Sequence, residues 1–514
     1  MIKILLIDCS RSLEEELRDV YDVHHPPVGL VALATHIEKS DLGKHTNFKI
    51  IDSTIDYETY EELEKIISDT APDIVGLRCL NKYTKQFHYA SKVAKKLPNK
   101  PLVIGGGPYP SAAPKETMEV DKFMDIVVIG EGETVFYDLI SAYLNKKPFS
   151  DVSGIYYREN GEAKISKNRE VIQDLDSIPF PDWKKIDFDR YKNIMGQAPV
   201  LRKMAPITTT RGCPYSCTYC HDLFQKRFRV RSAKHLVDEL EVLHDLGVHD
   251  ISIIDDIFNL YPKRVIDIFN LIIKKNLKFR FYYSNGLRGD RMTHEVIDAM
   301  VEGGSILFTY ALESGSRRIQ KLVKKQLRFE PFYEAVDYTV KKGVMVDIFM
   351  MVGFPTETEE EAFKTLDFLM QWDEICFPYL NEMNAFPGTE VYDKMVTQGM
   401  SDKEIRKSFA RGYQARGKDI VKLARFYFLK NYFLRRDRLK KAIAIQRKFL
   451  TDEEILYKYK TYLPGNHDRF KSVNELFEGI ALDTEKPNRV WVPETNEELR
   501  KAEALNSKPT VATI

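Results

Sequence analysis

At 514 residues the chain is too long for one ordinary hydrophobic core, so we expect two large domains and an appendage. Its 77 basic and 76 acidic side chains nearly cancel, which removes the electrostatic reason to expect a nucleic acid as the main partner. No uncharged apolar run approaches the roughly 18 residues that a membrane span requires, and Asp8 comes too early for a secretory signal peptide.

The cysteines indicate a reducing compartment. Of the 6 cysteines, three are crowded into residues 213–220 and the others are far apart in the sequence. That distribution differs from the disulfide framework of a small secreted protein. We therefore expect a soluble, cytoplasmic protein.

The amino-terminal part alternates short apolar runs with amphipathic stretches, which predicts a parallel sheet with helices between the strands. The predicted strands are 2–7, 48–51, 74–77, 102–104 and 126–129. The predicted helices are 27–39, 60–69, 84–96 and 133–144. Five strands in this order fit a Rossmann-like or flavodoxin-like domain, which we place at residues 1–148.

Residues 149–204 have a different pattern, which predicts a linker packed between two domains. It contains a hairpin in which 154–158 is the first strand and Asn160-Gly161 forms the turn. A second alternation over 205–398 predicts a partial (β/α)6 barrel of the TIM type. Its predicted strands are 206–210, 250–254, 279–284, 306–312, 345–350 and 375–380, and its clearest helices are 233–246, 261–275, 294–301 and 359–372.

The carboxyl-terminal region, 399–514, is predicted to be mainly helical. It is rich in Lys, Arg, Tyr and Phe, for example over 418–434. Amphipathic helices with solvated basic faces account for this composition, although a cover over the barrel mouth or a membrane-surface contact remains open. The tail from about Pro487 is polar, and we expect it to be loose.

The loop after the first barrel strand carries Cys213, Cys217 and Cys220. Spacings of four and three let a curled loop direct three thiolates at one metal centre. A cubane of four irons needs four ligands, so three cysteines leave one iron open. The alternatives are three unrelated thiols or a structural zinc site with His221 as fourth ligand, for which the usual paired spacing differs.

This cysteine pattern, with the aromatic Tyr219 before its last member, resembles the signature of the radical S-adenosylmethionine (SAM) superfamily. The resemblance implies that the open iron binds the amino and carboxylate groups of SAM. One electron from the cluster then splits the sulfonium and yields a 5′-deoxyadenosyl radical. Cofactor chemistry in such barrels takes place in loops after the strands, where these cysteines are predicted to lie.

Further segments extend the resemblance to about residue 395. By resemblance, the residues that contact SAM are Tyr219, Asp256, Ser284, Glu313 and Gly353. Gly353 allows close approach of the backbone. Each residue alone is weak evidence, because an acid after a strand more often caps a helix.

Three glycine-rich turns follow predicted strands of the amino-terminal domain. Each alone is consistent with an ordinary tight turn, but together they resemble the cobalamin-binding domain that is fused to many radical enzymes. The resemblance implies that the tail of a corrinoid enters the carboxyl edge of the sheet. The residues predicted to contact it are Gly76, Arg78, Gly105, Gly106, Gly107, Pro108, Gly130, Glu131 and Gly132.

One motif of the cobalamin mutases is missing. Their Asp-x-His-x-x-Gly sequence supplies a lower histidine ligand, whereas His24 and His25 stand in the corresponding loop without the glycine. Many fused radical enzymes also lack this ligand. The lower ligand of the cobalt is therefore left open.

The combined resemblance implies an enzyme that uses a 4Fe-4S cluster, SAM and cobalamin. The expected reaction is methylation of an unactivated carbon: the radical abstracts hydrogen, methylcobalamin delivers the methyl group, and a second SAM remethylates the cobalamin. A radical cyclase or rearranging enzyme resembling the anaerobic magnesium-protoporphyrin monomethyl ester cyclase is the alternative. A sensory cobalamin protein would need no cluster with an open iron.

Substrate residues are harder to predict. Tyr283 and Tyr310 lie near strand ends and are candidates for catalytic residues. The expected substrate is a small or lipid-like molecule, and the expected electron donor is a flavodoxin or a ferredoxin. We expect no nucleic-acid partner.

Overall fold

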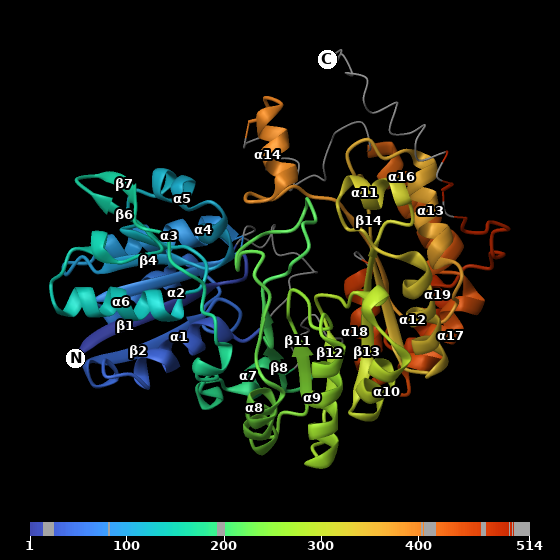
Figure 1. The fold of residues 1–514 in the computed structure, drawn as a ribbon, viewed down its shortest axis with the longest axis horizontal. Helices are drawn as coiled ribbons and strands as arrows, with labels where there is room; N and C mark the ends of the chain where they lie inside the picture. Colours follow the sequence, from blue (N-terminus) through green and yellow to red (C-terminus); the bar gives the residue numbers. More distant parts are fainter. Residues whose placement is uncertain are drawn as a thin grey trace. The chain divides into compact units, whose positions relative to one another are not determined.

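The computed structural model describes residues 1–13, 25–80, 83–192, 201–401, 404–405, 418–463, 469–492, 494–495 and 497. These residues group into two compact units, each of which is described by itself (Figure 1). The first unit contains Met1–Pro214, His221–Asp256 and Lys274–Phe279. The second contains Tyr215–Cys220, Ile257–Ile273 and the described part of Arg280–Ile514.

The first unit is built on a seven-stranded sheet with the order β2-β1-β3-β4-β5-β6-β7. Its five parallel strands confirm the predicted ones: β1 (Ile2–Cys9), β2 (Thr46–Asp52), β3 (Ile74–Cys79), β4 (Leu102–Gly106) and β5 (Ile126–Val128). The central strands are almost continuously apolar because helices cover both faces of a parallel sheet.

The helices of this unit bury two separate clusters, one on each face of the sheet. Side chains of α1 (Val28–Glu38) and α6 (Glu133–Leu144) pack with Ile4 and Leu6 on one face. Side chains of α2 (Tyr60–Thr70) and α3 (Thr84–Lys96) pack with Leu5 and Ile7 on the other. The short helices α4 (Pro108–Ala112) and α5 (Pro114–Val120) were not predicted.

The predicted hairpin is present, but its place differs from the prediction. Strands β6 (Ile155–Glu159) and β7 (Glu162–Ile165) turn at Asn160 and Gly161, which both have positive φ. β6 pairs antiparallel with β5, so the hairpin extends the first sheet instead of standing in a linker between domains. The open edge of a sheet favours such pairing, and the local sequence does not show which edge is open.

The rest of the predicted linker, as far as the structure describes it, packs within the first unit. Trp183 is buried and donates from Nε1 to Glu239 Oε1 at 2.8 Å. Tyr191, in the short helix α7 (Phe188–Tyr191), donates from its hydroxyl to Asp52 Oδ2 at 2.7 Å. Both contacts bind this segment firmly to its neighbours.

Six parallel strands follow in the order that the sequence predicts, with their ends displaced by a few residues. β8 (Met204–Ile207) and β11 (Asp250–Ile253) pair in the first unit. In the second unit, neighbours along the chain pair from β12 to β15: β12 (Arg280–Tyr283), β13 (Ser305–Glu313), β14 (Met345–Val352) and β15 (Pro378–Glu382). A short ribbon of β9 (Thr210–Arg211) and β10 (Arg229–Val230) lies in the first unit.

Helices alternate with these strands, as a βα barrel requires. The predicted helices are confirmed as α8 (Ala233–Asp245), α9 (Pro262–Lys274), α10 (His294–Glu302) and α13 (Glu359–Leu369). Two further helices, α11 (Arg317–Leu322) and α12 (Phe329–Lys341), follow β13. A short helix, α14 (Glu390–Thr397), comes after β15.

The carboxyl-terminal region is helical, as predicted. It contains α16 (Lys418–Phe428), a π-helix (Leu429–Phe433), α17 (Arg436–Gln446), α18 (Asp452–Tyr462) and α19 (Val473–Ile480). Among the described residues, no helix is both long enough and apolar enough to cross a membrane.

The prediction of a loose tail from about Pro487 is wrong for the part that the structure describes. Arg489 pairs with Asp367, and the buried carboxylate of Glu494 accepts from the amide of Arg317. A polar sequence shows no such partners by itself, because they come from helices more than a hundred residues away.

Candidate cluster and corrinoid sites

The loop with the three cysteines begins in the first unit and continues in the second. Cys213 follows β9 and Gly212, which has φ of 79°. A side chain at Gly212 would collide with the carbonyl of Arg227, so glycine is required at this turn. Cys217 and Cys220 belong to the second unit.

The two loop cysteines of the second unit affect each other's pKa. A hydrogen bond from the Cys220 thiol, together with the positive charges of Lys325 and Arg288, lowers the pKa of Cys217 to about 6 against the opposing effect of burial. The same hydrogen bond raises the pKa of Cys220. Thiolate is the form that ligates iron, so the charges around Cys217 fit a cluster ligand.

The second unit supports this part of the loop from two sides. The amide of Thr218 donates to the Val323 carbonyl at 3.0 Å. The guanidinium of Arg288 lies 3.7 Å from the centre of the Tyr215 ring, and Arg291 donates to the hydroxyl of Tyr215 at 3.2 Å. These contacts fix the positions of Tyr215 and Thr218 in the cysteine loop.

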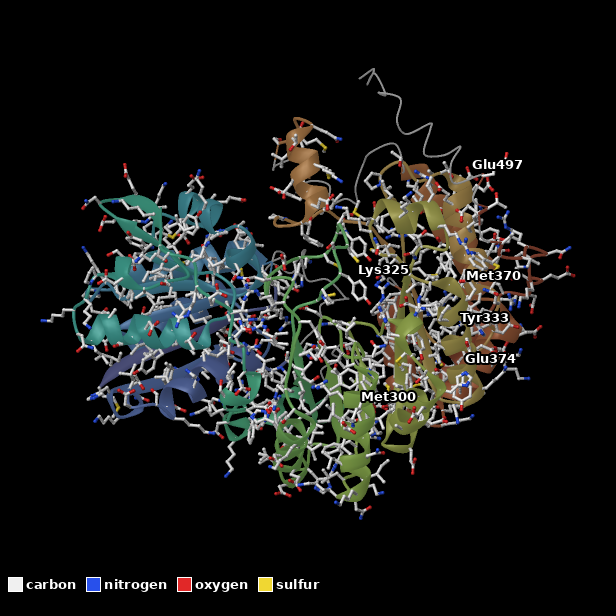
Figure 2. All side chains as sticks on the ribbon, viewed as in Figure 1. Met300, Lys325, Tyr333, Met370, Glu374 and Glu497 are labelled. Atoms are coloured by element: carbon white, nitrogen blue, oxygen red, sulfur yellow. The ribbon has the colours of Figure 1, made fainter. Side chains whose placement is uncertain are left out.

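Glu313, a predicted SAM contact, lies beside these cysteines. It ends β13 with φ of 68°, and its Oε1 accepts from Lys325 Nζ at 3.0 Å. Lys325, labelled in Figure 2, is buried, and its pKa is raised because the charges of Glu313, Cys217 and Cys220 outweigh desolvation. One lysine therefore faces both the thiolate and the carboxylate.

Tyr219 joins the same group. Its ring lies 6.2 Å from that of Phe354, which directly follows Gly353. Burial raises the pKa of Tyr219, and the negative charges of Glu313 and Cys217 raise it further. Cys217, Cys220 and two predicted SAM residues, Tyr219 and Glu313, are thus gathered in the second unit.

The turn at Gly353 depends on a carboxyl group to which the sequence analysis gave no role. Gly353 has φ of 87°, and its amide donates to Glu357 Oε2 at 2.6 Å. The amide of Phe354 donates to the same oxygen at 3.2 Å. Burial raises the pKa of Glu357 to about 8. The neutral form is therefore favoured in the folded protein.

We expect Glu357→Gln to flatten the dependence of the melting temperature on pH. The folded pKa lies above the ordinary value of 4.5, so the stabilising contribution is complete below that value and is lost as the pH rises towards 8. Between pH 6 and pH 9 the native protein should lose about 5 °C more than the variant. Glu360→Gln is the control, because the Glu360 side chain is 79% exposed. Identical curves for native protein and Glu357→Gln would contradict the expectation.

The two acidic residues after β11 have different environments. Asp255 is buried and accepts from the amide and hydroxyl of Thr209, each at 2.5 Å, and from the amide of Thr210 at 3.1 Å. Asp256, the predicted SAM contact, is half-buried and lies 3.9 Å from His221 Nε2. Asp255 therefore holds the backbone of the segment that leads to the cysteine loop. Asp256 is then the acid that is available to a ligand.

The remaining predicted residues of the barrel are buried. Ser284 follows β12 and is 9% exposed. The hydroxyls of Tyr283 and Tyr310 each share a hydrogen bond of 2.7 Å, with Ser305 and Thr339 respectively. Burial raises the pKa of both tyrosines. These positions favour a packing role for the two tyrosines and do not support a catalytic one.

No group of three His, Cys, Asp or Glu side chains that could hold a metal ion is present among the described residues. His221 Nε2 lies 3.9 Å from Asp256 Oδ1, as noted above. His24 lies outside the described residues, so the question of a lower cobalt ligand stays open.

The predicted corrinoid glycines have different local functions. A side chain at Gly76 would lie 2.6 Å from Leu6 Cδ2, and one at Gly105 would lie 2.9 Å from Phe87 Cζ. A side chain at either position would force Leu6 or Phe87 to move inside the first unit. A side chain at Gly106 would meet nothing within 4 Å.

The other predicted residues of this edge lie in turns or at the beginnings of helices. Gly107 has φ of 88°, Pro108 begins α4, Gly130 has φ of 75°, and a side chain at Gly132 would lie 3.1 Å from Leu33. Positive φ accounts for the need for glycine at the first and third of these positions.

We expect Gly106→Ala to weaken cobalamin binding without loss of stability. The added methyl group has free space in the protein, whereas a corrinoid at this turn would be displaced by it. The affinity measured by equilibrium dialysis of the apoprotein should fall about tenfold. Gly105→Ala is the comparison, because crowding of Phe87 should lower its melting temperature. Unchanged cobalamin affinity in Gly106→Ala would place the corrinoid elsewhere.

Arg78 and Glu131, predicted to contact cobalamin, already have partners in the protein. Arg78 Nη1 lies 2.8 Å from both carboxylate oxygens of Asp8 and donates to Ser10 Oγ at 2.7 Å. Glu131 accepts from Arg229 at 2.8 and 2.9 Å and from Arg211 at 2.8 Å. Neither prediction gains support, because both side chains are engaged in ion pairs.

The contacts of Glu131 join two functional segments. Glu131 lies in the glycine turn after β5, Arg211 lies in β9, and Arg229 lies in β10. Arg211 also pairs with Glu133 at 2.5 Å, and its pKa is raised by these carboxylates. We call Glu131, Glu133, Arg211 and Arg229 the ion network. It binds the predicted corrinoid edge to the two strands that flank the cysteine loop.

Comparison with known protein families gives two matches. The pattern of the Radical SAM superfamily matches residues 207–369, and that of the B12 binding domain matches residues 17–140. The first match contains the cysteine loop and every predicted SAM residue. The second contains all of the predicted cobalamin residues.

Individual relatives agree with these matches. A protein of Pyrococcus horikoshii described as an uncharacterized methyltransferase is 30% identical over 403 residues, which cover 78% of this chain and 84% of that protein. The anaerobic magnesium-protoporphyrin IX monomethyl ester cyclase of Rubrivivax gelatinosus is 24% identical over 68% of this chain and 62% of its own length.

A solved structure is similar as well. It is that of the radical S-adenosylmethionine methyltransferase TsrM from Kitasatospora setae, with cobalamin and a 4Fe-4S cluster bound. It superposes with a TM-score of 0.62 and 18% identity over 77% of this chain and 78% of its own. At this identity the likeness concerns the fold: a B12-binding domain, a radical SAM domain after it, and a helical carboxyl-terminal region.

Proposed function

The chain belongs to the radical SAM superfamily, as a member that also carries a B12-binding domain, and from this premise we propose that it methylates an unactivated carbon of a small or lipid-like molecule. The ion network is the observation that supports this proposal. It links the predicted corrinoid edge to the cysteine loop through Glu131, Arg211 and Arg229. A methyl donor and a radical source that serve one substrate must keep a defined spacing.

The cofactors that the two domains imply are a 4Fe-4S cluster, SAM and cobalamin. When they are bound, the cluster supplies the electron that cleaves SAM, and cobalamin supplies the methyl group. Cys213, Cys217 and Cys220 would hold the cluster, since they are the three cysteines of one loop. The positive charge of Lys325 stabilises the Cys217 thiolate and orients Glu313.

The product mixture tests the proposal. The protein is reconstituted anaerobically with iron, sulfide and cobalamin, and its products with SAM and a reductant are identified by mass spectrometry. Methylation produces both 5′-deoxyadenosine and S-adenosylhomocysteine. The absence of either product would contradict the proposed radical methylation.

A second function is favoured by the relative that is a cyclase. Ring closure or rearrangement needs the radical but transfers no methyl group, so 5′-deoxyadenosine would form without S-adenosylhomocysteine. We further propose a cytoplasmic location, a flavodoxin or ferredoxin as electron donor, and no nucleic-acid partner. Reduction of the cluster by a purified flavodoxin system tests the proposed donor.

A further inference from the structure

Residues 489–492 and 494, near the end of the described chain, contact helix α13 and the turn after β13 in the second unit. We call this segment the clasp. Arg489 donates to both carboxylate oxygens of Asp367 in α13, at 2.8 and 3.0 Å from Nε. Asp367 is 4% exposed, whereas the side chain of Arg489 is 44% exposed, so the carboxylate is removed from water and the guanidinium is only partly covered. The ion pair fixes the beginning of the clasp on α13.

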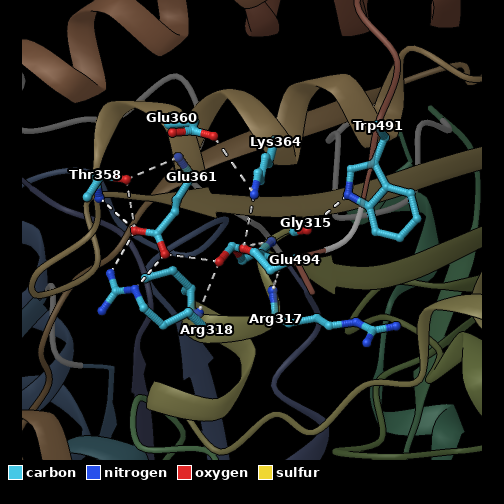
Figure 3. Close-up of polar contacts among 12 residues, drawn as sticks. Gly315, Arg317, Arg318, Thr358, Glu360, Glu361, Lys364, Trp491 and Glu494 are labelled. Carbon is cyan, nitrogen blue, oxygen red and sulfur yellow. Dashed lines mark hydrogen bonds and ion pairs between the residues drawn. The ribbon is translucent and has the colours of Figure 1, made fainter. Parts of the chain in front are cut away.

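The clasp then contacts the turn between β13 and α11. Trp491 donates from Nε1 to the carbonyl of Gly315 at 3.0 Å (Figure 3). Its ring meets Phe329 and Phe368 edge-on, with centroids 5.0 and 4.8 Å away. Glu494 is 8% exposed and accepts from the amide of Arg317 at 2.9 Å. The clasp therefore binds the backbone of this turn at two points.

Helix α13 holds the same turn from another direction. The amide of Gly315 donates to Thr365 Oγ1 at 2.9 Å, and a side chain at Gly315 would lie 2.6 Å from the carbonyl of Lys364. Ser316 Oγ donates to Glu361 Oε1 at 3.1 Å. Lys364 Nζ also forms an ion pair with Glu494 Oε1 at 3.6 Å. Figure 3 marks this ion pair with a dashed line. The turn is enclosed between α13 and the clasp.

The enclosed turn begins directly after the residue that approaches the cysteines. Glu313 lies two positions before Gly315 and adopts a positive φ, which is uncommon for a glutamate and persists only when its surroundings enforce it. Its carboxylate pairs with the buried Lys325, whose charge also acts on Cys217. A change in the turn would move Glu313 relative to Lys325.

We propose that Trp491 and Glu494 are positioning residues that set Glu313 for SAM binding through the turn at Gly315. The proposal rests on the proposed function, because it assigns the SAM site to the surroundings of Glu313. The clasp acts by restraining a backbone segment whose other end carries the ligand-facing carboxylate.

Two truncations of the full chain test the proposal. One ends after Asn488 and lacks the clasp, and its matched control ends after Glu497 and lacks only residues 498–514. Trp491→Phe is the mild variant, because the ring remains while the donor to Gly315 is lost. Val492→Ala is its control, since Val492 is 62% exposed. All proteins are reconstituted anaerobically, and SAM is titrated while the spectrum of the reduced cluster is recorded by electron paramagnetic resonance.

We expect SAM affinity to fall about tenfold in the truncation after Asn488 and several-fold in Trp491→Phe, with both controls unchanged. Hydrogen exchange should accelerate at the amides of residues 315–319 in the same two proteins. If the full-length protein binds SAM and the clasp variants bind it equally well, the proposed role of the clasp is wrong, while the proposed function is not contradicted. Full-length protein with a cluster that binds no SAM would overturn the proposed function and the clasp with it.

Discussion

Triple substitution of Cys213, Cys217 and Cys220 by alanine is expected to abolish the formation of 5′-deoxyadenosine. The cluster is the source of the electron that splits SAM, and no other cysteines of the chain lie within the same loop. The variant should also lose its iron after anaerobic reconstitution. Iron and sulfide analysis and mass spectrometry of the products measure the two losses separately.

The control for this prediction is Cys376→Ala. Cys376 is buried in the second unit, and burial raises the pKa of its thiol. The thiolate, which is the form that binds iron, is therefore disfavoured at this position. This variant should keep its iron and its SAM cleavage. A triple variant that still produced 5′-deoxyadenosine would refute the assignment of the cluster to these cysteines.

Glu131→Ala is expected to have the largest effect on stability. The side chain of Glu131 is 6% exposed, and so is that of its partner Arg229, so the substitution leaves a buried cation without its counter-charge. Removal of one partner from a buried pair costs about 3–5 kcal/mol. For a unit of this size the loss corresponds to a melting temperature about 10 °C lower. Differential scanning calorimetry of the apoprotein measures it without any cofactor.

An exposed ion pair supplies the control for Glu131→Ala. Glu119 lies 3.7 Å from Lys115, with side chains that are 56% and 72% exposed. Exposed pairs of this kind contribute about 0–1 kcal/mol, so Glu119→Ala should leave the melting temperature nearly unchanged. Equal melting temperatures for the two variants would show that the ion network does not stabilise the first unit. Loss of cobalamin binding in Glu131→Ala at unchanged stability would restore the sequence-based assignment of Glu131.

Some features of the fold and of the candidate site could be predicted from the sequence, and others could not. The strands were predictable because a short apolar run between two amphipathic helices is long enough for a buried strand and too short for a helix, as at 2–7 and 74–77. The predicted packing of the hairpin was wrong because its neighbour, β5, is recognised only when the edge of the sheet is known. The role of Glu357 was not found, since the residue gives no signal except its place shortly after Gly353 and Pro355.

The same reasoning accounts for the outcome at the candidate site. Cys217, Cys220, Tyr219 and Glu313 were predicted from motifs and are close together in the second unit. Arg78 was predicted from a glycine-rich turn after a strand that resembles the cobalamin-binding domain, and Tyr310 from its place near a strand end, but the structure gives both of them protein partners. The end of a strand fixes the position of a residue's backbone. The neighbouring elements determine which groups its side chain contacts.

The sequence alone determined the two domain types, the order of their strands and the loop with the three cysteines, because hydrophobic periodicity and close spacing along the chain are local properties. Only the tertiary structure decided the partners of Glu131, the role of Asp255 and the position of the clasp. These depend on charged or polar groups that burial forces to pair with residues tens to more than a hundred positions away. Such pairing leaves no trace in a single sequence.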